Sequence, residues 1–383
     1  MEFFRNTNYD FIGRGRGFLI LSALAAAIGV LAMGVNQLRH GSILNYGTDF
    51  LGGSELHVEF AKGVDPARIR EALEGGGYSG AEVVSLKDER RKHFYLLRLS
   101  QVSAFAKPQM DKARAELAKL DSKLRKFDHP EQGDKVFVRF EKTIEPSALS
   151  AAFGRAGVAV QDVQQFGRLE DHAYQVTLGG LEREIERVFE ARLGAGAVKD
   201  IPQVESVGAK VGKKLRNDGV KSLVYTILLI LAYIWFRFDF HFAPGAIVAM
   251  VHDVLMVVGV FALFWKEFTL QSVAALLTIA GYSVNDTIVV FDRVRENLVR
   301  LRDRRLAVLV NTSVNETLSR TVLTGMPTLF ATFALWYFTR GAVRDFALAM
   351  LLGVVFGTYS SIFVAAPIYV WMVERFPRNK PRV

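Results

Sequence analysis

Ionisable side chains inside long apolar segments are the residues of this sequence best suited to do chemistry. Asp286 lies in the stretch GYSVNDTIVVFDRVREN (281–297), and Arg320 immediately precedes the next apolar stretch. His252 and Asp253 interrupt another apolar segment. A charge at the centre of a membrane-spanning helix costs about 2.5–3.5 kcal/mol on insertion scales, so such residues are functional candidates by default.

The pair Asp286 and Arg320 has two interpretations. Asp286 is expected about five residues from the inner end of its helix, on the order of 8 Å at 1.5 Å per residue. Arg320 is expected at the inner end of the next helix, so a contact is permitted. The pair could be a static ion pair that orients two helices. Alternatively, Asp286 binds protons while Arg320 alternately matches and releases its charge, because one charge crossing 100 mV gains about 2.3 kcal/mol.

Other residues in these segments have supporting roles. We expect five polar residues to support the charged pair inside the membrane: His252, Asp253, Ser283, Asn285 and Thr324. The last apolar segment carries Gly353, Gly357 and Ser361 at four-residue spacing. Small residues at this spacing are typical of close helix packing, and we expect these three to form a packing seam.

Composition excludes several kinds of chemistry. The 383 residues include no cysteine, which excludes disulfides, zinc sites with Cys ligands, iron–sulfur clusters and thiol catalysis. The hydrophilic part shows no nucleophile–base pair, phosphate loop or metal-ligand cluster. We therefore predict no enzyme activity, no cofactor and no metal, and favour a binding or mechanical role.

Apolar residues are concentrated in six blocks, each long enough to cross about 30 Å of hydrocarbon. The first, 17–35, has no charge and follows Arg14 and Arg16. A cleaved signal peptide is the rival interpretation, but this core is long for one and no clear A-x-A site follows. The remaining blocks lie in the second half of the chain: 220–236, 243–264, 269–291, 321–338 and 346–372.

The basic residues predict the orientation of the chain. With the N-terminus in the cytosol, the cytosolic segments carry 14 Lys and Arg, whereas the short outer loops carry three. This bias is typical of cytosolic loops. Hence we expect 1–16 and 373–383 in the cytosol, 36–219 outside, and 220–372 to form helices two to six. Most of the net charge of +9 then reflects topology, and we predict no nucleic-acid partner.

The outer segment contains an internal repeat at an offset of 80 residues. Residues 55–73 align without gaps on 135–153, and the proline and glycine positions coincide. Each unit reads as a strand, a helix with proline in its first turn, and two more strands. We predict an α+β domain of two βαββ repeats, at about 54–100 and 134–180.

A charged segment, 107–127, links the two repeats. Its apolar residues recur at alternating steps of three and four, which indicates one stripe along a long helix. This helix could project as an arm, or it could lie on its own domain.

Six motifs resemble those of the SecF family, subunits of the bacterial Sec protein-export machinery. In order they are GTDFLGG (47–53), VESVGAKVGKKL (204–215), RFDFHFAPGAIVAMVHDVLMVVG (237–259), GYSVNDTIVVFDRVREN (281–297), NTSVNETLSRT (311–321) and GTYSSIFVAAP (357–367). They cover the whole membrane part and both edges of the outer segment.

The resemblance implies a multi-pass protein of the bacterial inner membrane whose outer domain is periplasmic. Its expected partners are a SecD-like subunit, the SecYEG channel, translocating preproteins and membrane lipid. It implies that Asp286 and Arg320 take part in proton passage that drives export. Two alternatives are a subunit of an exporter of the related resistance-nodulation-division type and a purely structural subunit.

Two features depart from the family pattern. The usual outer domain holds close to one βαββ unit, whereas this sequence predicts two. After Arg320 the family generally has T-S-x-T-T, whereas this chain has TVLTGMPT (321–328). The hydroxyl at the Gly325 position is therefore absent, and a polar path there would have to use Thr324 or Thr328.

Overall fold

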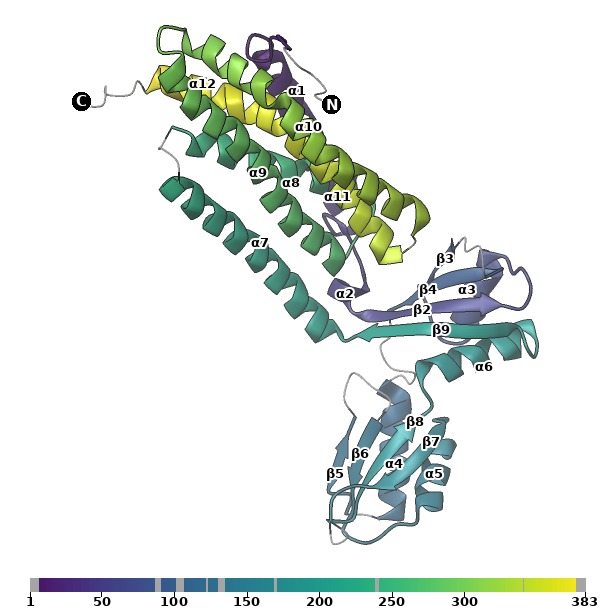
Figure 1. The fold of residues 1–383 in the computed structure, drawn as a ribbon. Helices are drawn as coiled ribbons and strands as arrows, with labels where there is room; N and C mark the ends of the chain where they lie inside the picture. Colours follow the sequence, from purple (N-terminus) through teal and green to yellow (C-terminus); the bar gives the residue numbers. More distant parts are fainter. Residues whose placement is uncertain are drawn as a thin grey trace. The chain divides into compact units, whose positions relative to one another are not determined.

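The computed structural model describes residues 7–86, 91–100, 107–121, 123–129, 135–168, 171–237, 241–339 and 341–376. The outermost parts of the two predicted cytosolic termini, 1–6 and 377–383, lie outside the described residues. The chain forms two compact units. Met1–Gly47 and Arg216–Val383 make a helical unit, and Thr48–Leu215 make an α+β unit (Figure 1).

Six candidate membrane spans form in the described part of the chain, one N-terminal and five after the α+β unit, which confirms the predicted arrangement. Their helices are α1 (Gly15–His40), α7 (Ala209–Arg237), α8 (Ala243–Leu263), α9 (Leu270–Arg300), α10 (Leu306–Phe338) and α11 (Gly341–Ser360). The sixth span continues through a π-helix, η2 (Ser361–Ala365), into α12 (Ala366–Arg375). Two short strands, β1 (Asn45–Tyr46) and β10 (Glu267–Phe268), pair in parallel within the helical unit.

The core of the helical unit lies among α8, α9 and the sixth span. In each of these three spans, 56% of the most apolar stretch is buried within the chain, against 11% for α1 and for α7. Helix α9 begins with a capping box between Thr269 and Ser272, which satisfies backbone groups at the helix start. Within this core the rings of Phe242 and Tyr369 stack with centroids 4.3 Å apart, and the ring of Phe291 packs against both at a tilt.

The α+β unit contains two four-stranded antiparallel sheets, each covered by two helices. The first lobe has the strand order β3-β4-β2-β9. Its elements are β2 (Gly53–Phe60), α3 (Pro66–Gly75), β3 (Glu82–Leu86), β4 (Phe94–Leu99), α6 (Leu181–Leu193) and β9 (Val198–Val207), preceded by the short helix α2 (Thr48–Leu51). The N-cap of α3 is Asp65, whose carboxylate accepts from the Ala67 backbone N–H at 2.8 Å.

The second lobe has the equivalent strand order, β5-β6-β8-β7. Its elements are α4 (Lys107–Leu120), β5 (Lys126–Asp128), β6 (Lys135–Arg139), α5 (Pro146–Arg155), β7 (Val160–Gln165) and β8 (Ala173–Leu178). The predicted βαββ order appears in both lobes, as β2-α3-β3-β4 and as β6-α5-β7-β8. The two lobes have separate apolar cores.

The expected long helix over 107–127 is wrong in its last part. Helix α4 ends at Leu120, and the Asp121 carboxylate accepts from the Lys123 backbone N–H at 3.0 Å just beyond it. The chain then enters β5, which pairs with β6. The apolar stripe of α4 is buried in the core of the second lobe, so the helix lies on its own domain and the projecting arm is excluded.

Candidate functional site: polar residues of the helical unit

Asp286 lies within the buried stripe of α9. The stripe contains Ala280, Ser283, Thr287 and Val290, spaced so that they share one face of the helix. Asp286 is 2% exposed, and its Oδ2 atom accepts a 3.5 Å hydrogen bond from Thr358 Oγ1 on α11. Among the residues that the structure describes, this carboxylate has no ion-pair partner. The arrangement is therefore a carboxylate in an apolar setting with one weak hydroxyl donor.

Arg320 lies on α10 and is exposed on the surface of the helical unit. The contact with Asp286 that the sequence permits is not made in this conformation. Asn285, next to Asp286, is also exposed. The Thr324 hydroxyl donates to the backbone oxygens of Arg320 and Thr321, both at 3.0 Å, so it is engaged within its own helix.

Asp253 is the most deeply buried acidic group of the helical unit, with no exposed surface. Its Oδ1 lies 3.0 Å from Nδ1 of His252. Its Oδ2 accepts a 2.7 Å hydrogen bond from Ser360 Oγ and a second one from Ser283 Oγ. The carboxylate thus joins α8, α9 and α11. Ser283 was among the predicted supporting residues, whereas Ser360 was not, although it lies beside Ser361 in the motif GTYSSIFVAAP (357–367).

The seam of small residues faces α9. A Cβ atom at Gly357 would lie 3.0 Å from Ser283 Cβ, so a larger residue there would require Ser283 to shift. Gly353 lies against Ile279, one turn earlier on α9, and Ser361 Oγ lies 2.9 Å from Thr287 Oγ1, one turn later. The helix changes to the π-form of η2 at Ser361, the last residue of this seam, and π-turns are found frequently at functional sites.

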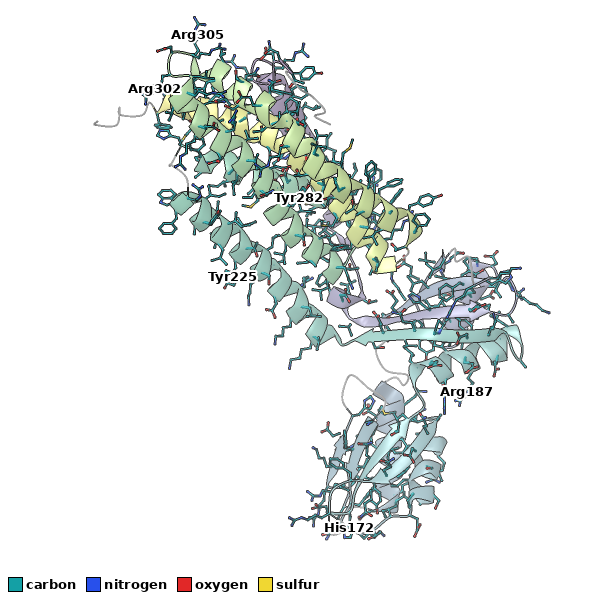
Figure 2. All side chains as sticks on the ribbon, in the orientation of Figure 1. His172, Arg187, Tyr225, Tyr282, Arg302 and Arg305 are labelled. Atoms are coloured by element: carbon teal, nitrogen blue, oxygen red, sulfur yellow. The ribbon has the colours of Figure 1, made fainter. Side chains whose placement is uncertain are left out.

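Two hydroxyls surround the position where the family pattern has a hydroxyl and this chain has Gly325. A Cβ atom there would lie 3.7 Å from Thr358 Oγ1 and 3.8 Å from Tyr282 Oη. Tyr282, labelled in Figure 2, lies on α9, and its hydroxyl donates to the Thr324 backbone oxygen at 3.3 Å. Tyr282 and Thr358 were not among the predicted site residues. Tyr282 precedes Asp286 by four residues on α9, a spacing that places both on one face of the helix, whereas no spacing links Thr358 on α11 to Asp286.

Helices α9 and α10 are also joined by an ion network near their connection. Glu316 accepts from Arg293 Nε at 2.6 Å, from Asn297 Nδ2 at 2.7 Å and from the Arg300 guanidinium. These groups come from facing sides of the two helices, so the network stabilises their pairing.

A pair of asparagines on α10 binds the N-terminal segment. Asn311 Oδ1 accepts from the backbone N–H groups of Phe11 and Ile12 at 2.8 and 3.2 Å. Asn315, one turn later, accepts from the Tyr9 N–H at 2.9 Å, and both amides donate to the Tyr9 oxygen. The segment before α1 is therefore held through its backbone, whatever its side chains.

The first lobe carries a partly buried charged group on its sheet. Glu55 lies 3.3 Å from Arg98 Nε and 3.6 Å from His57 Nε2, and Arg98 also contacts Glu82 at 3.2 Å. Burial raises the pKa of the Glu55 carboxyl. Hydrogen bonds from His57 and Arg98 and their charges outweigh this and hold the pKa below its ordinary value.

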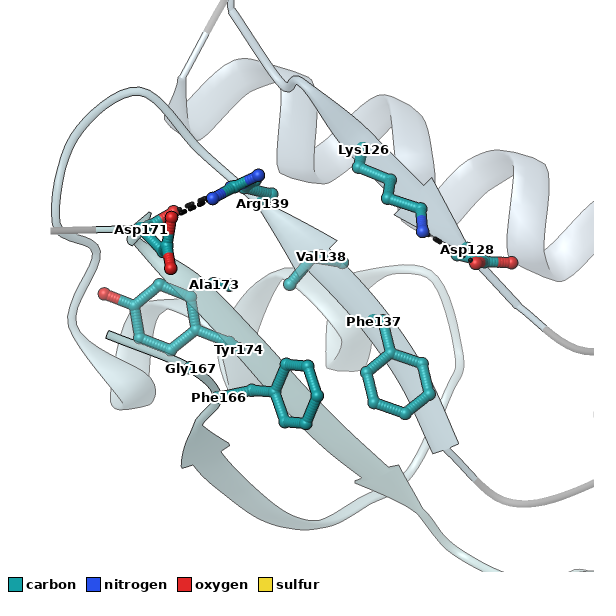
Figure 3. A pocket seen from close by; sticks show the side chains of 10 residues that line it. All are labelled: Lys126, Asp128, Phe137, Val138, Arg139, Phe166, Gly167, Asp171, Ala173 and Tyr174. Atoms are coloured by element: carbon teal, nitrogen blue, oxygen red, sulfur yellow. Dashed lines mark hydrogen bonds and ion pairs between the residues drawn. The ribbon is translucent and has the colours of Figure 1, made fainter. Parts of the chain in front are cut away.

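The second lobe has a pocket of about 390 Å³ on its sheet (Figure 3). Two aromatic rings, Phe137 and Phe166, meet edge to face there with centroids 5.3 Å apart. Around them lie two ion pairs, Arg139 with Asp171 and Lys126 with Asp128. Within the described residues there is no group of acidic or histidine side chains that could hold a metal ion. The pocket is thus an apolar surface with neutralised charges and no evident chemistry.

These features define a multi-pass membrane protein with ionisable groups inside its helical unit and a duplicated α+β domain between its first two spans. The protein export membrane protein SecD/SecF family (C-terminal part) matches residues 190–375. The protein translocase subunit SecF of Koribacter versatilis is 33% identical over 97% of this chain and 93% of its own length. That of Thermodesulfovibrio yellowstonii is 33% identical over 94% of both chains.

A solved structure has a similar fold. The crystal structure of SecDF, a translocon-associated membrane protein from Thermus thermophilus, matches with a TM-score of 0.65 and 29% identity. The match covers 97% of this chain but 39% of that one. The chain belongs to the SecF family of protein translocase subunits, which are non-enzymatic components of membrane transport.

Proposed function

We propose that this chain works with a SecD-like subunit to drive protein translocation through the SecYEG channel with the proton motive force. Asp286 would bind and release the proton, and Arg320 would match its charge in one part of the cycle. His252, Asp253, Ser283, Asn285 and Thr324 would support this path, and the seam of Gly353, Gly357 and Ser361 would pack the helices around it.

The observation that carries the proposal is the buried Asp286 carboxylate, which forms no ion pair within the described part of the chain. An ionised carboxylate in low-dielectric surroundings is costly unless it is paired, whereas its protonated form is not. Asp286 has a single 3.5 Å hydroxyl donor, so its charge is poorly compensated in this conformation. A conformation that brings Arg320 to it would favour the ionised form. Proton binding and helix movement are thereby linked.

The exposure of Arg320 supports a membrane partner. An arginine and an amide, Asn285, both lie on the surface of the helical unit within candidate spans. Lipid tails cannot form hydrogen bonds with the guanidinium and the amide, so these two groups need a polar partner in the membrane. The similarity to the Thermus SecDF structure, in which this chain matches 39% of the other, makes a SecD-like subunit the natural candidate.

The arginine distribution supports the proposed topology. The connection between α9 and α10 carries Arg302, Arg304 and Arg305, two of which are labelled at one end of the helical unit in Figure 2. With this end in the cytosol, both termini are cytosolic and residues 36–219 are periplasmic, in the inner membrane of a bacterium. There the α+β unit could contact an emerging preprotein.

The test is gradient-dependent protein export by membrane vesicles that contain the chain, its SecD-like partner and the channel. Asp286→Asn should abolish the increase in export caused by a proton gradient while the partner still co-purifies. Asp292→Asn, at an exposed position on the same helix, is the matched control and should behave like the unaltered protein. Unchanged gradient-dependent export in Asp286→Asn would instead indicate a structural subunit.

A second arm separates export of proteins from export of small molecules. A photocrosslinker in the α+β unit should label a preprotein arrested during translocation. Labelling by small amphiphiles alone would contradict the proposal and favour an exporter of the resistance-nodulation-division type.

A further inference from the structure

We infer that His252 and Asp253 form a second proton-binding site of the helical unit, which takes up a proton at Nε2 of His252. This site is separate from Asp286, and the inference deepens the proposed function by adding a second group to the proton path.

The hydrogen bonds around Asp253 determine where the histidine hydrogen lies. The hydroxyls of Ser283 and Ser360 both donate to Oδ2. Oδ1 faces Nδ1 of His252 at 3.0 Å. An ionised carboxylate only accepts hydrogen bonds, so Nδ1 must carry a hydrogen and donate it. In the neutral imidazole, the other ring nitrogen then has a free lone pair.

That second nitrogen is placed to accept a proton. His252 is 7% exposed, and its Nε2 atom is buried with no hydrogen-bond partner in the described part of the chain. A proton bound there turns the imidazole into an imidazolium beside the carboxylate. The net charge of the dyad changes from −1 to zero, so proton uptake removes an uncompensated buried charge rather than creating one.

The described residues of the neighbouring helices supply no positive charge that would neutralise Asp253 in place of a proton. From α11, the ring of Tyr359 lies 6.2 Å from that of His252, and its hydroxyl is engaged by the Phe18 oxygen and by Ser22 on α1. Helix α1 has no ionisable side chain from 17 to 38. From α9, Ser283 faces the dyad. The acidic residue nearest to Ser283 along that helix is Asp286, one turn away. The dyad therefore depends on its own proton for neutrality.

The test is nitrogen-15 NMR of histidine-labelled protein in lipid bilayers, with the His252 signals assigned by their loss in His252→Gln. Nδ1 should be protonated throughout, while Nε2 should change from unprotonated to protonated as the pH falls. In Asp253→Asn this change should be lost over the same pH range, because no carboxylate then neutralises the imidazolium. The same titration in Asp286→Asn should persist.

An Nε2 that stays in one protonation state across the range in which the protein is folded would overturn the inference. So would a titration that Asp253→Asn leaves unchanged. Neither outcome bears on Asp286, whose role is tested by gradient-dependent export, so the two proposals can fail separately.

A second inference rests on the strand order of the α+β unit. Along the chain the order βαββαβ occurs twice, first as β2-α3-β3-β4-α4-β5 and then as β6-α5-β7-β8-α6-β9. We infer that these are tandem copies of one domain that have exchanged their last helix and strand.

Pairing and packing both show the crossed arrangement. β9, the last strand of the second copy, pairs antiparallel with β2 of the first, and β5, the last strand of the first copy, pairs antiparallel with β6 of the second. Each occupies the same edge of its sheet. In the same way α6 packs beside α3, and α4 beside α5. Each lobe is therefore completed by the other copy.

The rival explanation is that α4 and β5 are an extension that belongs only to the second lobe. Deletion of 129–207 separates these explanations, because it leaves the first copy intact and joins β5 to the segment before α7. The exchange predicts that β5 then pairs with β2. By the 80-residue offset, Val138, which faces Phe127, corresponds to Val58.

The readout is a disulfide, which this cysteine-free chain allows without background. In the deletion variant, Val58→Cys with Phe127→Cys should crosslink, whereas the full-length chain with the same pair should not. A deletion of 101–180 serves as the folded reference for the 129–207 deletion. It keeps the pairings of the first lobe, which are β2 with β4, β2 with β9 and β3 with β4. A 129–207 deletion that is unfolded, or folded without the crosslink, would overturn the exchange.

Discussion

The crossing of α1 and α8 depends on two glycines in direct backbone contact. A Cβ atom at Gly29 would lie 2.8 Å from the Cα of Gly259, and one at Gly259 would lie 3.0 Å from the Cα of Gly29. Carbon atoms in contact normally lie about 3.5–4.0 Å apart. Gly29→Ala must therefore push the two helices apart by roughly 1 Å, because backbone cannot move aside as a flexible side chain can.

The expected effect is a loss of stability despite a better helix former. Overpacking costs about 1–3 kcal/mol, whereas replacing glycine by alanine inside a helix gains about 1 kcal/mol. The balance is a destabilisation of up to about 2 kcal/mol. Gly34→Ala on the same helix is the control, because a Cβ atom there meets nothing within 4 Å. It should be neutral or slightly stabilising.

The assay is unfolding of the purified protein in mild detergent by titration with a denaturing one, followed by circular dichroism. The free energies of unfolding of the two variants should differ by about 2 kcal/mol, roughly thirtyfold in the equilibrium constant. Equal stability of Gly29→Ala and Gly34→Ala would refute the close crossing of α1 and α8.

Three further predictions concern other contacts. Gly325→Ser should fold normally, because its Cβ would lie at ordinary contact distance, and its hydroxyl should be within reach of Thr358 and preserve or raise gradient-dependent export. Glu55 has a lowered pKa, so its stabilising contact with Arg98 is present above the ordinary Glu pKa and is lost as the pH falls through the folded value. Between about pH 5 and pH 3, Glu55→Gln should therefore reduce the pH-dependent change in the free energy of unfolding by about 1 kcal/mol or less. Asn311→Ala should release the N-terminal segment, seen as faster proteolysis before α1 with the rest of the chain unchanged.

Much of the architecture could be predicted because repeated patterns of apolar residues in the sequence indicate it. Predominantly apolar runs of about twenty residues are typical of membrane helices, so six spans could be predicted from the distribution of apolar residues. The offset of 80 residues gave both βαββ units, because a strand and a proline-started helix leave periodic signals. The same periodicity described α4, but it could not tell where the helix ends or what covers its stripe.

The polar contacts between helices were less accessible to sequence reasoning. Asp286 and Asp253 are conspicuous because charge is rare in apolar runs. Their partners Thr358 and Ser360 are small hydroxyl residues, which are common in membrane helices and carry no spacing signal. Arg320 was expected beside Asp286, but similar depth does not fix the rotation of α10, which leaves Arg320 on the surface. The completion of each lobe by the other copy likewise follows from strand pairing, which no local pattern records.

The most direct test of the account is proton movement through the purified complex of this chain with its SecD-like partner in proteoliposomes. A pH-sensitive dye inside the vesicles would report proton entry under an imposed gradient. We expect entry with the unaltered protein and with Asp292→Asn, and none with Asp286→Asn. Proton entry that persists in Asp286→Asn, with the complex intact, would contradict the central claim that this buried carboxylate carries the proton.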